Sequence, residues 1–169
     1  SSQPSSLPTM LHACISGTYL SKSWSSSAGE TRSCQPCLPG SFSLDNALVC
    51  ESCPSGYYAS RAGAKECLPC PGGYHSFEGG AALCMKCPGG TNSSSAASSC
   101  SKCPQGFYAE EGSEFCEPCP EGHYSLKQSS QCTMCPPGTI SNATASRCTP
   151  CPEGHYSYPG TDACLPCQK

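Results

Sequence analysis

The sequence has few of the residues that build a conventional hydrophobic core. Leu, Ile, Val and Phe together number 17 of 169 residues, about a tenth of the chain, where roughly a fifth marks the floor for globular proteins. Such a chain does not bury enough apolar surface to offset the entropy of ordering its backbone. Its stability must therefore come from another source.

Charge and long apolar runs are also scarce. Only 12 % of residues are charged and the formal net charge is −3, which excludes a basic stripe for nucleic acid or anionic lipid. No apolar run approaches the roughly 20 residues that span a bilayer, so we expect no direct membrane insertion of this segment. The chain opens Ser-Ser-Gln-Pro, without an initiator Met or a signal-peptide core, which indicates a processed chain or an excerpt.

Cysteine, by contrast, is abundant, with 19 residues or about 11 % of the chain, a level typical of disulfide scaffolds. After Cys14 every cysteine belongs to a C-x-x-C pair, and successive pairs begin 16 or 17 residues apart. Persistent disulfides require an oxidising compartment. The sequence therefore predicts an extracellular or cell-surface protein built from internal repeats.

The stretch between pairs also repeats, as C-P-x-G-x-Y-S-(turn)-C. Glycine always stands three residues after the opening cysteine, and two residues later comes an aromatic or large side chain in all units but one, which has Asn92. The next residue is Ser or Ala in eight of nine units. Proline begins a tight turn and glycine supplies the positive φ that such a turn demands. Each unit is thus a miniature hairpin, too small to be stable unless it is stapled.

The first unit indicates which cysteines pair. Cys14 is followed by Gly17 and Tyr19, as an opening cysteine should be, but Leu11 occupies the position of its C-x-x-C mate. Cys14 should therefore pair forward with Cys34, around a longer Ser-rich loop. A crossed scheme, which pairs the first cysteine with the third and the second with the fourth, would leave Cys14 and one whole C-x-x-C pair without partners. A ladder, in which each opening cysteine pairs with the next closing cysteine, is therefore favoured. The remaining expected pairs are Cys37–Cys50, Cys53–Cys67, Cys70–Cys84, Cys87–Cys100, Cys103–Cys116, Cys119–Cys132, Cys135–Cys148 and Cys151–Cys164.

The predicted fold class is small and disulfide-rich: an elongated tandem array of β-hairpin repeats, stapled as a disulfide ladder, with almost no helix. Closing one such loop contributes roughly 3 kcal/mol in the chain-entropy model. With contacts only between nearest neighbours, the array should be a rod. Its expected parts are an N-terminal extension (1–13), a first, long-loop repeat (14–34), eight further repeats of 16–17 residues (35–167) and a truncated end (168–169). Cys167 is left unpaired, so we expect the native chain to continue to a partner cysteine or Cys167 to link another chain.

The unit Cys103-Pro104-Gln105-Gly106-Phe107-Tyr108-Ala109 resembles the ephrin-receptor-like cysteine-rich repeat. It is also similar to the first-type module of tumour necrosis factor receptor domains, in which one disulfide closes the C-P-x-G-x-Y loop. The resemblance covers residues 14–167 and implies the same pairing within each loop. The receptor family alternates this module with a crossed type that is missing here, so no ligand-binding residues carry over.

The sequence gives little support for metal binding, redox activity or catalysis. Nine C-x-x-C pairs do not group into fours for zinc, and redox activity at such a pair needs a helix N-terminus or a cationic neighbour. No catalytic motif is present. The histidines in or beside the aromatic slot, His75, His123 and His155, are expected to pack within the hairpins, as are the aromatic rings. We expect no enzymatic activity, no cofactor and no metal.

Two sequons, at Asn92 and Asn142, are expected to carry N-linked glycans in a secreted chain. The uniform repeats and low charge favour a non-enzymatic structural protein, a stalk, coat or fibre subunit that associates with itself. The alternative is a receptor or adhesion ectodomain that binds another extracellular protein through some repeats. A binder should concentrate irregularity on a few units. The clearest irregularity is the long first loop, with Trp24 and Arg32.

Overall fold

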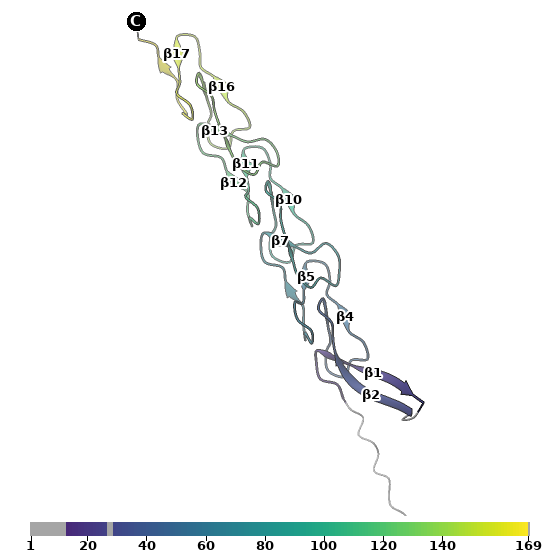
Figure 1. Ribbon diagram of the computed structural model, residues 1–169. Helices are drawn as coiled ribbons and strands as arrows, with labels where there is room; N and C mark the ends of the chain where they lie inside the picture. Colours follow the sequence, from purple (N-terminus) through teal and green to yellow (C-terminus); the bar gives the residue numbers. More distant parts are fainter. Residues whose placement is uncertain (1–12, 27–28, 169) are drawn as a thin grey trace, which may run out of the picture.

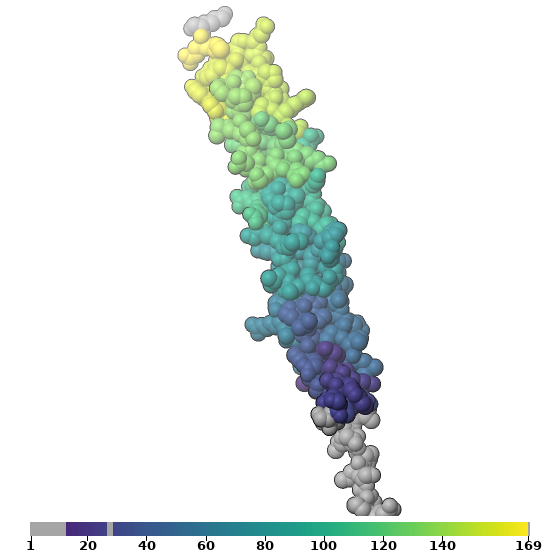
Figure 2. All heavy atoms as spheres, turned by 45° about the vertical axis from the view of Figure 1, so that its right-hand side comes forward, coloured from purple at the N-terminus to yellow at the C-terminus, as the bar shows by residue number. Residues whose placement is uncertain are grey.

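The computed structural model describes residues 13–26 and 29–168, so most of the expected N-terminal extension lies outside the described residues. Within these ranges there is no helix, and every sheet is one antiparallel pair of strands. The hairpins follow one another along a narrow rod, with the hairpin of β1 and β2 at one end and that of β17 and β18 at the other (Figure 1, Figure 2). The predicted fold class, an elongated and helix-free disulfide ladder, is confirmed.

Two long strands open the array, and two-residue strands make up the rest. β1 (Thr18–Ser25) pairs with β2 (Gly29–Pro36) over eight residues. The short strands are β3 (Ser41–Phe42), β4 (Glu51–Ser52), β5 (Tyr57–Tyr58), β6 (Leu68–Pro69), β7 (Tyr74–His75), β8 (Met85–Lys86), β9 (Thr91–Asn92), β10 (Ser101–Lys102), β11 (Phe107–Tyr108), β12 (Glu117–Pro118), β13 (His123–Tyr124), β14 (Thr133–Met134), β15 (Thr139–Ile140), β16 (Thr149–Pro150), β17 (His155–Tyr156) and β18 (Leu165–Pro166).

Each hairpin is one unit, running from an opening cysteine to the residue before the next opening cysteine. Units 1 to 9 are residues 14–36, 37–52, 53–69, 70–86, 87–102, 103–118, 119–134, 135–150 and 151–166. The two middle residues of each C-x-x-C form the second strand of the hairpin, opposite the aromatic slot; in unit 3, Tyr58 faces Leu68. The C-x-x-C pairs are therefore strands as well as connections between units.

The turn that opens each unit follows from its glycine and, in units 3 to 9, from the proline after the opening cysteine; units 1 and 2 form the same turn with Ile15 and Leu38 in that place. In unit 3 the Tyr57 amide donates to the Pro54 carbonyl at 3.1 Å, which closes the turn. Gly56 has a φ of 84°, a value that L side chains rarely adopt. Its carbonyl then accepts a hydrogen bond from the amide of Cys70, the first residue of unit 4, at 2.9 Å. The same bond recurs from every opening cysteine that follows a unit, including Cys167.

Nine disulfides close the loops of successive units. Each joins the opening cysteine of a unit to its closing cysteine, from Cys14–Cys34 to Cys151–Cys164. The sequence separation is 20 residues in the first unit and 13 or 14 in all the others. The Cα atoms lie 5.5 to 5.8 Å apart, inside the range that a disulfide prefers. None of these nine disulfides joins one unit to another, so non-covalent contacts register the units on one another.

Hydrogen bonds supply some of these contacts, in a pattern that repeats from unit to unit. Between units 3 and 4, the Gly56 amide donates to the Ser76 carbonyl at 2.9 Å, and the Gly80 amide donates to the Cys53 carbonyl at 2.7 Å. The Ser76 hydroxyl donates to the Tyr57 carbonyl at 3.2 Å. Four of these junctions also carry a parallel β-bridge, such as His75 with Ala97. Each unit is thus registered on the next through backbone groups.

Contact also reaches the next unit but one, so our expectation of contacts only between nearest neighbours was wrong. A Cβ added to Gly56 of unit 3 would overlap the carbonyl oxygen of Ala96 in unit 5. The opening glycines of units 1 to 7 all approach a turn two units further on in this way, whereas Gly138 and Gly154 have open space. The reason is physical: a glycine without a side chain lets the later turn lie directly against its backbone.

The core is a line of cysteines and small residues. Seven opening cysteines, from Cys37 to Cys135, are fully buried, and the Ser or Ala after the aromatic slot is buried in units 2 to 9, as at Ser43 and Ala59. The aromatic rings expected to form the core are only half-buried in units 1 to 8 where a ring is present, and Tyr156 in unit 9 is exposed. The rings therefore cover the core and do not compose it.

Candidate interaction surface

The hairpin of unit 1 carries the most exposed large apolar side chain of the described residues. Trp24 on β1 is 78 % exposed. In the register of β1 and β2, Trp24 lies opposite Glu30 and Lys22 lies opposite Arg32, so all four share one face. Arg32 Nε donates to Glu30 Oε1 at 2.8 Å, and this bond and the arginine charge lower the pKa of Glu30. Within the described residues, the ammonium group of Lys22 has no ion-pair partner.

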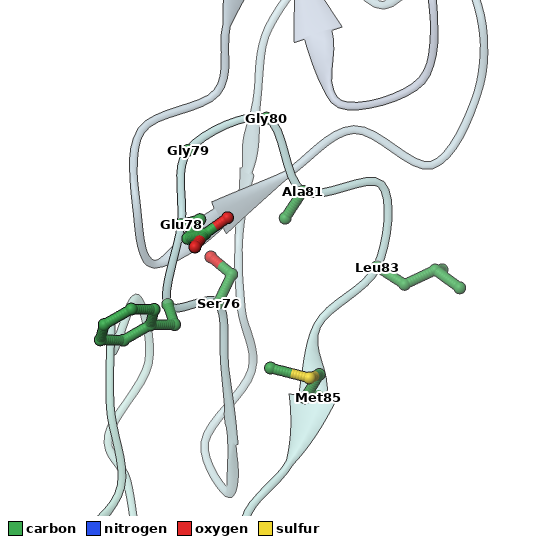
Figure 3. Close-up of a pocket in the computed structure, with 8 residues that line it drawn as sticks. Ser76, Glu78, Gly79, Gly80, Ala81, Leu83 and Met85 are labelled. Carbon is green, nitrogen blue, oxygen red and sulfur yellow. The ribbon is translucent and has the colours of Figure 1, made fainter.

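Unit 4 contains an open hollow of about 410 Å³. Its lining is mainly apolar and includes Phe77, Ala81, Leu83 and Met85, with Glu78 as the charged group. Figure 3 shows Ser76, Glu78, Ala81 and Met85 around the hollow, beneath the turn of Gly79 and Gly80. Three of the apolar side chains are strongly exposed: Phe77 at 69 %, Leu83 at 72 % and Met85 at 56 %.

Equivalent positions in the other units show that unit 4 differs from them. Seven residues after the opening cysteine, just before the closing cysteine, and just after it, unit 4 has Phe77, Leu83 and Met85. At the same three positions unit 5 has Ser94, Ser99 and Ser101, unit 2 has Leu44, Val49 and Glu51, and unit 9 has Tyr158, Ala163 and Leu165. Among the described units, unit 4 is the one with a large apolar side chain at all three positions. The irregularity expected from the sequence was the long loop of unit 1, and the cluster in unit 4 was not predicted. Its signal in the sequence is the run of apolar residues at equivalent positions of the repeat.

His75 lies beside the disulfide of the next unit. Its Nδ1 is 3.1 Å from Sγ of Cys100 and 4.0 Å from Sγ of Cys87, so the three residues have the spacing of metal ligands. The two sulfurs, however, are bonded to each other, and zinc binds thiolates, not disulfides. Asn92 takes the same place one unit later, with Oδ1 3.3 Å from Sγ of Cys116. Slot residues thus pack on the adjacent disulfide.

The two sequons have different surroundings. The Asn92 side chain is half-buried, and its Nδ2 donates to the Glu114 carbonyl at 3.0 Å. The Asn142 side chain is exposed, on the turn that follows β15. A glycan is attached through the side-chain nitrogen, and in Asn92 this nitrogen is already in contact with Glu114. Glycosylation at both positions stays a prediction, with Asn142 the more accessible acceptor.

The C-terminal unit is more open than those before it. Cys167 is exposed and is the unpaired cysteine of the described residues. The rings of Tyr156 and Tyr158 meet edge to face, with centroids 5.5 Å apart, and their hydrogen bond raises the pKa of Tyr156. In unit 6, a hydrogen bond from the Tyr108 hydroxyl to Glu117 Oε2 at 3.1 Å likewise raises the pKa of Tyr108. The expected link from Cys167 to another chain stays a prediction.

Comparison with known proteins identifies one family. The model of the family described as tyrosine-protein kinase ephrin type A/B receptor-like matches residues 40–82, 90–127 and 106–142. The last two ranges overlap, as expected for tandem repeats, and the three together cover more than half of the 169 residues. Comparison with curated proteins found no significant match.

Proposed function

Because the chain belongs to the ephrin type A/B receptor-like family of cysteine-rich repeats, we propose that it is a non-enzymatic structural protein of the cell exterior. In this role it is a stalk, coat or fibre subunit that associates with itself. The family modules are of the non-catalytic ectodomain type, and the nine disulfides indicate an oxidising, extracellular location. Within the described residues there is no helix suited to crossing a membrane.

The observation that carries this proposal is the overlap of units along the rod. Each unit bonds to the next, and seven opening glycines fit against a turn two units further on. A hinge between two units would have to break contacts with both the next unit and the one after it. Such overlap makes the array stiff over its whole length, which is the property that a spacer or fibre needs.

The alternative, a receptor or adhesion ectodomain, is favoured by a different observation. Unit 4 departs from the uniform pattern and exposes Phe77, Leu83 and Met85 around a hollow. Unit 2 also exposes Leu38, Leu44, Leu48 and Val49, so the feature that distinguishes unit 4 is the hollow that its apolar side chains line. An exposed apolar hollow of this kind is typical of a protein-binding surface. The two functions differ in the partner: another copy of this chain for the structural protein, and a different protein for the receptor.

Solution scattering and electron microscopy of native material test the proposal. A compact protein of 169 residues would have a radius of gyration of about 15 Å, and the rod should give a clearly larger value. Regular higher-order assemblies in the micrographs are the expected result. A chain that stays monomeric at every concentration, and binds one foreign protein, would contradict the structural role and support the receptor role.

A further inference from the structure

We propose that the hairpin of unit 1 in one copy docks into the hollow of unit 4 in a second copy, with Trp24 as the inserted side chain and Lys22 paired with Glu78. This inference rests on the proposed structural function and specifies the contact through which the chain associates with itself. The two surfaces are complementary: one is a projecting hairpin with an apolar side chain and a cation, and the other is an apolar hollow with a carboxylate.

The hairpin supplies a projecting apolar group beside a positive charge. Trp24 is 78 % exposed on a two-stranded ribbon that extends from the end of the rod (Figure 1). Lys22 lies two residues away on the same face of β1, and Arg32 faces it across the ribbon. Arg32 is bonded to Glu30. The charge of Lys22 also lowers the pKa of Glu30, but Lys22 makes no ion pair within the described residues, so it is the cation on this face that can pair with another molecule. Tryptophan is enriched among the residues that contribute most of the binding energy at protein interfaces.

The hollow supplies the matching chemistry. Its volume of about 410 Å³ lies in the range of ligand pockets and accommodates an indole ring. Phe77, Leu83 and Met85 offer an aromatic ring, a branched chain and a thioether, all of which pack well on an indole. Glu78 stands at the same site and has no ion-pair partner within the described part of the chain. The hollow therefore selects an apolar group that is flanked by a cation.

The two surfaces cannot meet within one molecule. Unit 1 lies at one end of the rod and unit 4 further along it, and the overlapping contacts of units 1 to 4 hold them apart (Figure 1). Each copy therefore has one free hairpin and one free hollow. A contact between unlike surfaces is heterologous, and it propagates into an open assembly instead of closing as a dimer. Two hollows meeting each other would place Glu78 against Glu78, which electrostatics disfavours.

Single substitutions at the two surfaces test the contact. The probe is the 169-residue chain with Cys167 alkylated. Its self-association is measured by sedimentation at protein concentrations from about 1 to 500 µM, because small interfaces bind weakly. Trp24→Ser and Phe77→Ser should each weaken self-association at least about tenfold. Leu38→Ser and Leu126→Ser, which remove equally exposed apolar groups elsewhere, should leave it unchanged.

Charge reversal gives a second, independent measurement. Lys22→Glu and Glu78→Lys should each weaken association, and the two combined in one chain should restore it. Glu66→Lys, on an exposed residue of unit 3, is the matched control. Every substituted side chain is exposed, so the fold should be kept. Non-reduced peptide mapping that recovers the same nine disulfide pairs in each variant shows this.

A mixing experiment distinguishes this contact from any other. Trp24→Ser keeps an intact hollow and Phe77→Ser keeps an intact hairpin, so each alone should be monomeric and an equimolar mixture should form a 1:1 dimer that grows no further. A mixture that stays monomeric while the wild type assembles overturns the proposed contact and leaves the structural function standing. A wild-type chain that is monomeric up to about 500 µM overturns self-association itself.

Discussion

One hydroxyl recurs at the junctions between units. The serine after the aromatic slot donates from Oγ to a strand carbonyl of the preceding unit in units 2, 4, 5, 7, 8 and 9, at 2.9 to 3.2 Å. Units 3 and 6 have Ala59 and Ala109 instead, which are equally buried but offer no donor. The chain therefore contains its own comparison between junctions with and without this bond.

Exchanging the two residue types should change the junctions in opposite directions. Ser125→Ala removes the 2.9 Å bond to the Phe107 carbonyl and should destabilise that junction by about 1 kcal/mol. Ala109→Ser should add the corresponding bond to Thr91. Hydrogen exchange of the amides in units 5 to 7 measures both, with a change of about fivefold expected in each case. Equal exchange in all three proteins would show that the hydroxyl contributes nothing.

The sequons give a second prediction at the scale of single residues. In material from a glycosylating host, intact glycopeptide mass spectrometry should find Asn142 more fully occupied than Asn92. The reason is that Asn142 is exposed, whereas Nδ2 of Asn92 bonds the Glu114 carbonyl beside the next disulfide. Asn92→Ser, which cannot be glycosylated but keeps a small polar group, should lower the glycan mass less than Asn142→Ser. Equal occupancy at both sites would contradict this order.

Among the elements, the opening turn of each unit is under two separate constraints. Its glycine has a φ between 72° and 85° in all nine units, a conformation that costs other residues about 1–2 kcal/mol. In units 1 to 7 the same glycine also lies against a turn two units further on. The positive φ is a requirement of the single hairpin, whereas the close contact is a requirement of the array. The effects of the two can be measured separately with one pair of substitutions.

Gly56→Ala should be more destabilising than Gly138→Ala. Both positions have nearly the same φ, 84° and 79°, so both variants lose about 1–2 kcal/mol to the backbone conformation. Only at Gly56 would the new Cβ also overlap a backbone oxygen, that of Ala96, while Gly138 faces open space. Hydrogen exchange should show loosening that extends from unit 3 to unit 5 for Gly56→Ala and remains in unit 8 for Gly138→Ala. Local effects of equal size would mean that second-neighbour contact adds no stability.

For the whole molecule, the ladder depends on the pair Cys14–Cys34. Non-reduced peptide mapping should recover this pair together with eight others, each confined to one unit, because the short loops keep the two Cα atoms within 5.8 Å. A free thiol at Cys14, or a peptide that joins two units, would contradict the ladder. Opening the first loop alone, with Cys14→Ser and Cys34→Ser, should loosen unit 1 and leave units 4 to 9 protected from exchange.

The sequence was sufficient to predict those features of the fold that depend on residues within one repeat. In units 2 to 9 the glycine and the two cysteines lie within 16 or 17 residues, and in units 3 to 9 a proline follows the opening cysteine, so the turn, the hairpin and the rod follow from local chemistry. The contact between unit 1 and unit 3 could not be predicted in this way. Gly17 and Gly63 meet through backbone atoms, and backbone atoms leave no side-chain pattern. The hollow around Phe77 was missed because its residues look ordinary until equivalent units are compared.

The disulfides also determine how far the molecule can be stretched. A pulling force on the two ends passes through each S–S bond and bypasses the 13 residues or so that the bond encloses. With every hydrogen bond broken, one unit then extends to only about 16 Å, since the path is one disulfide and three residues long. The same unit after reduction reaches about 55 Å. In an oxidising environment the chain is therefore a tether with a hard limit to its length, and reduction would more than triple that limit.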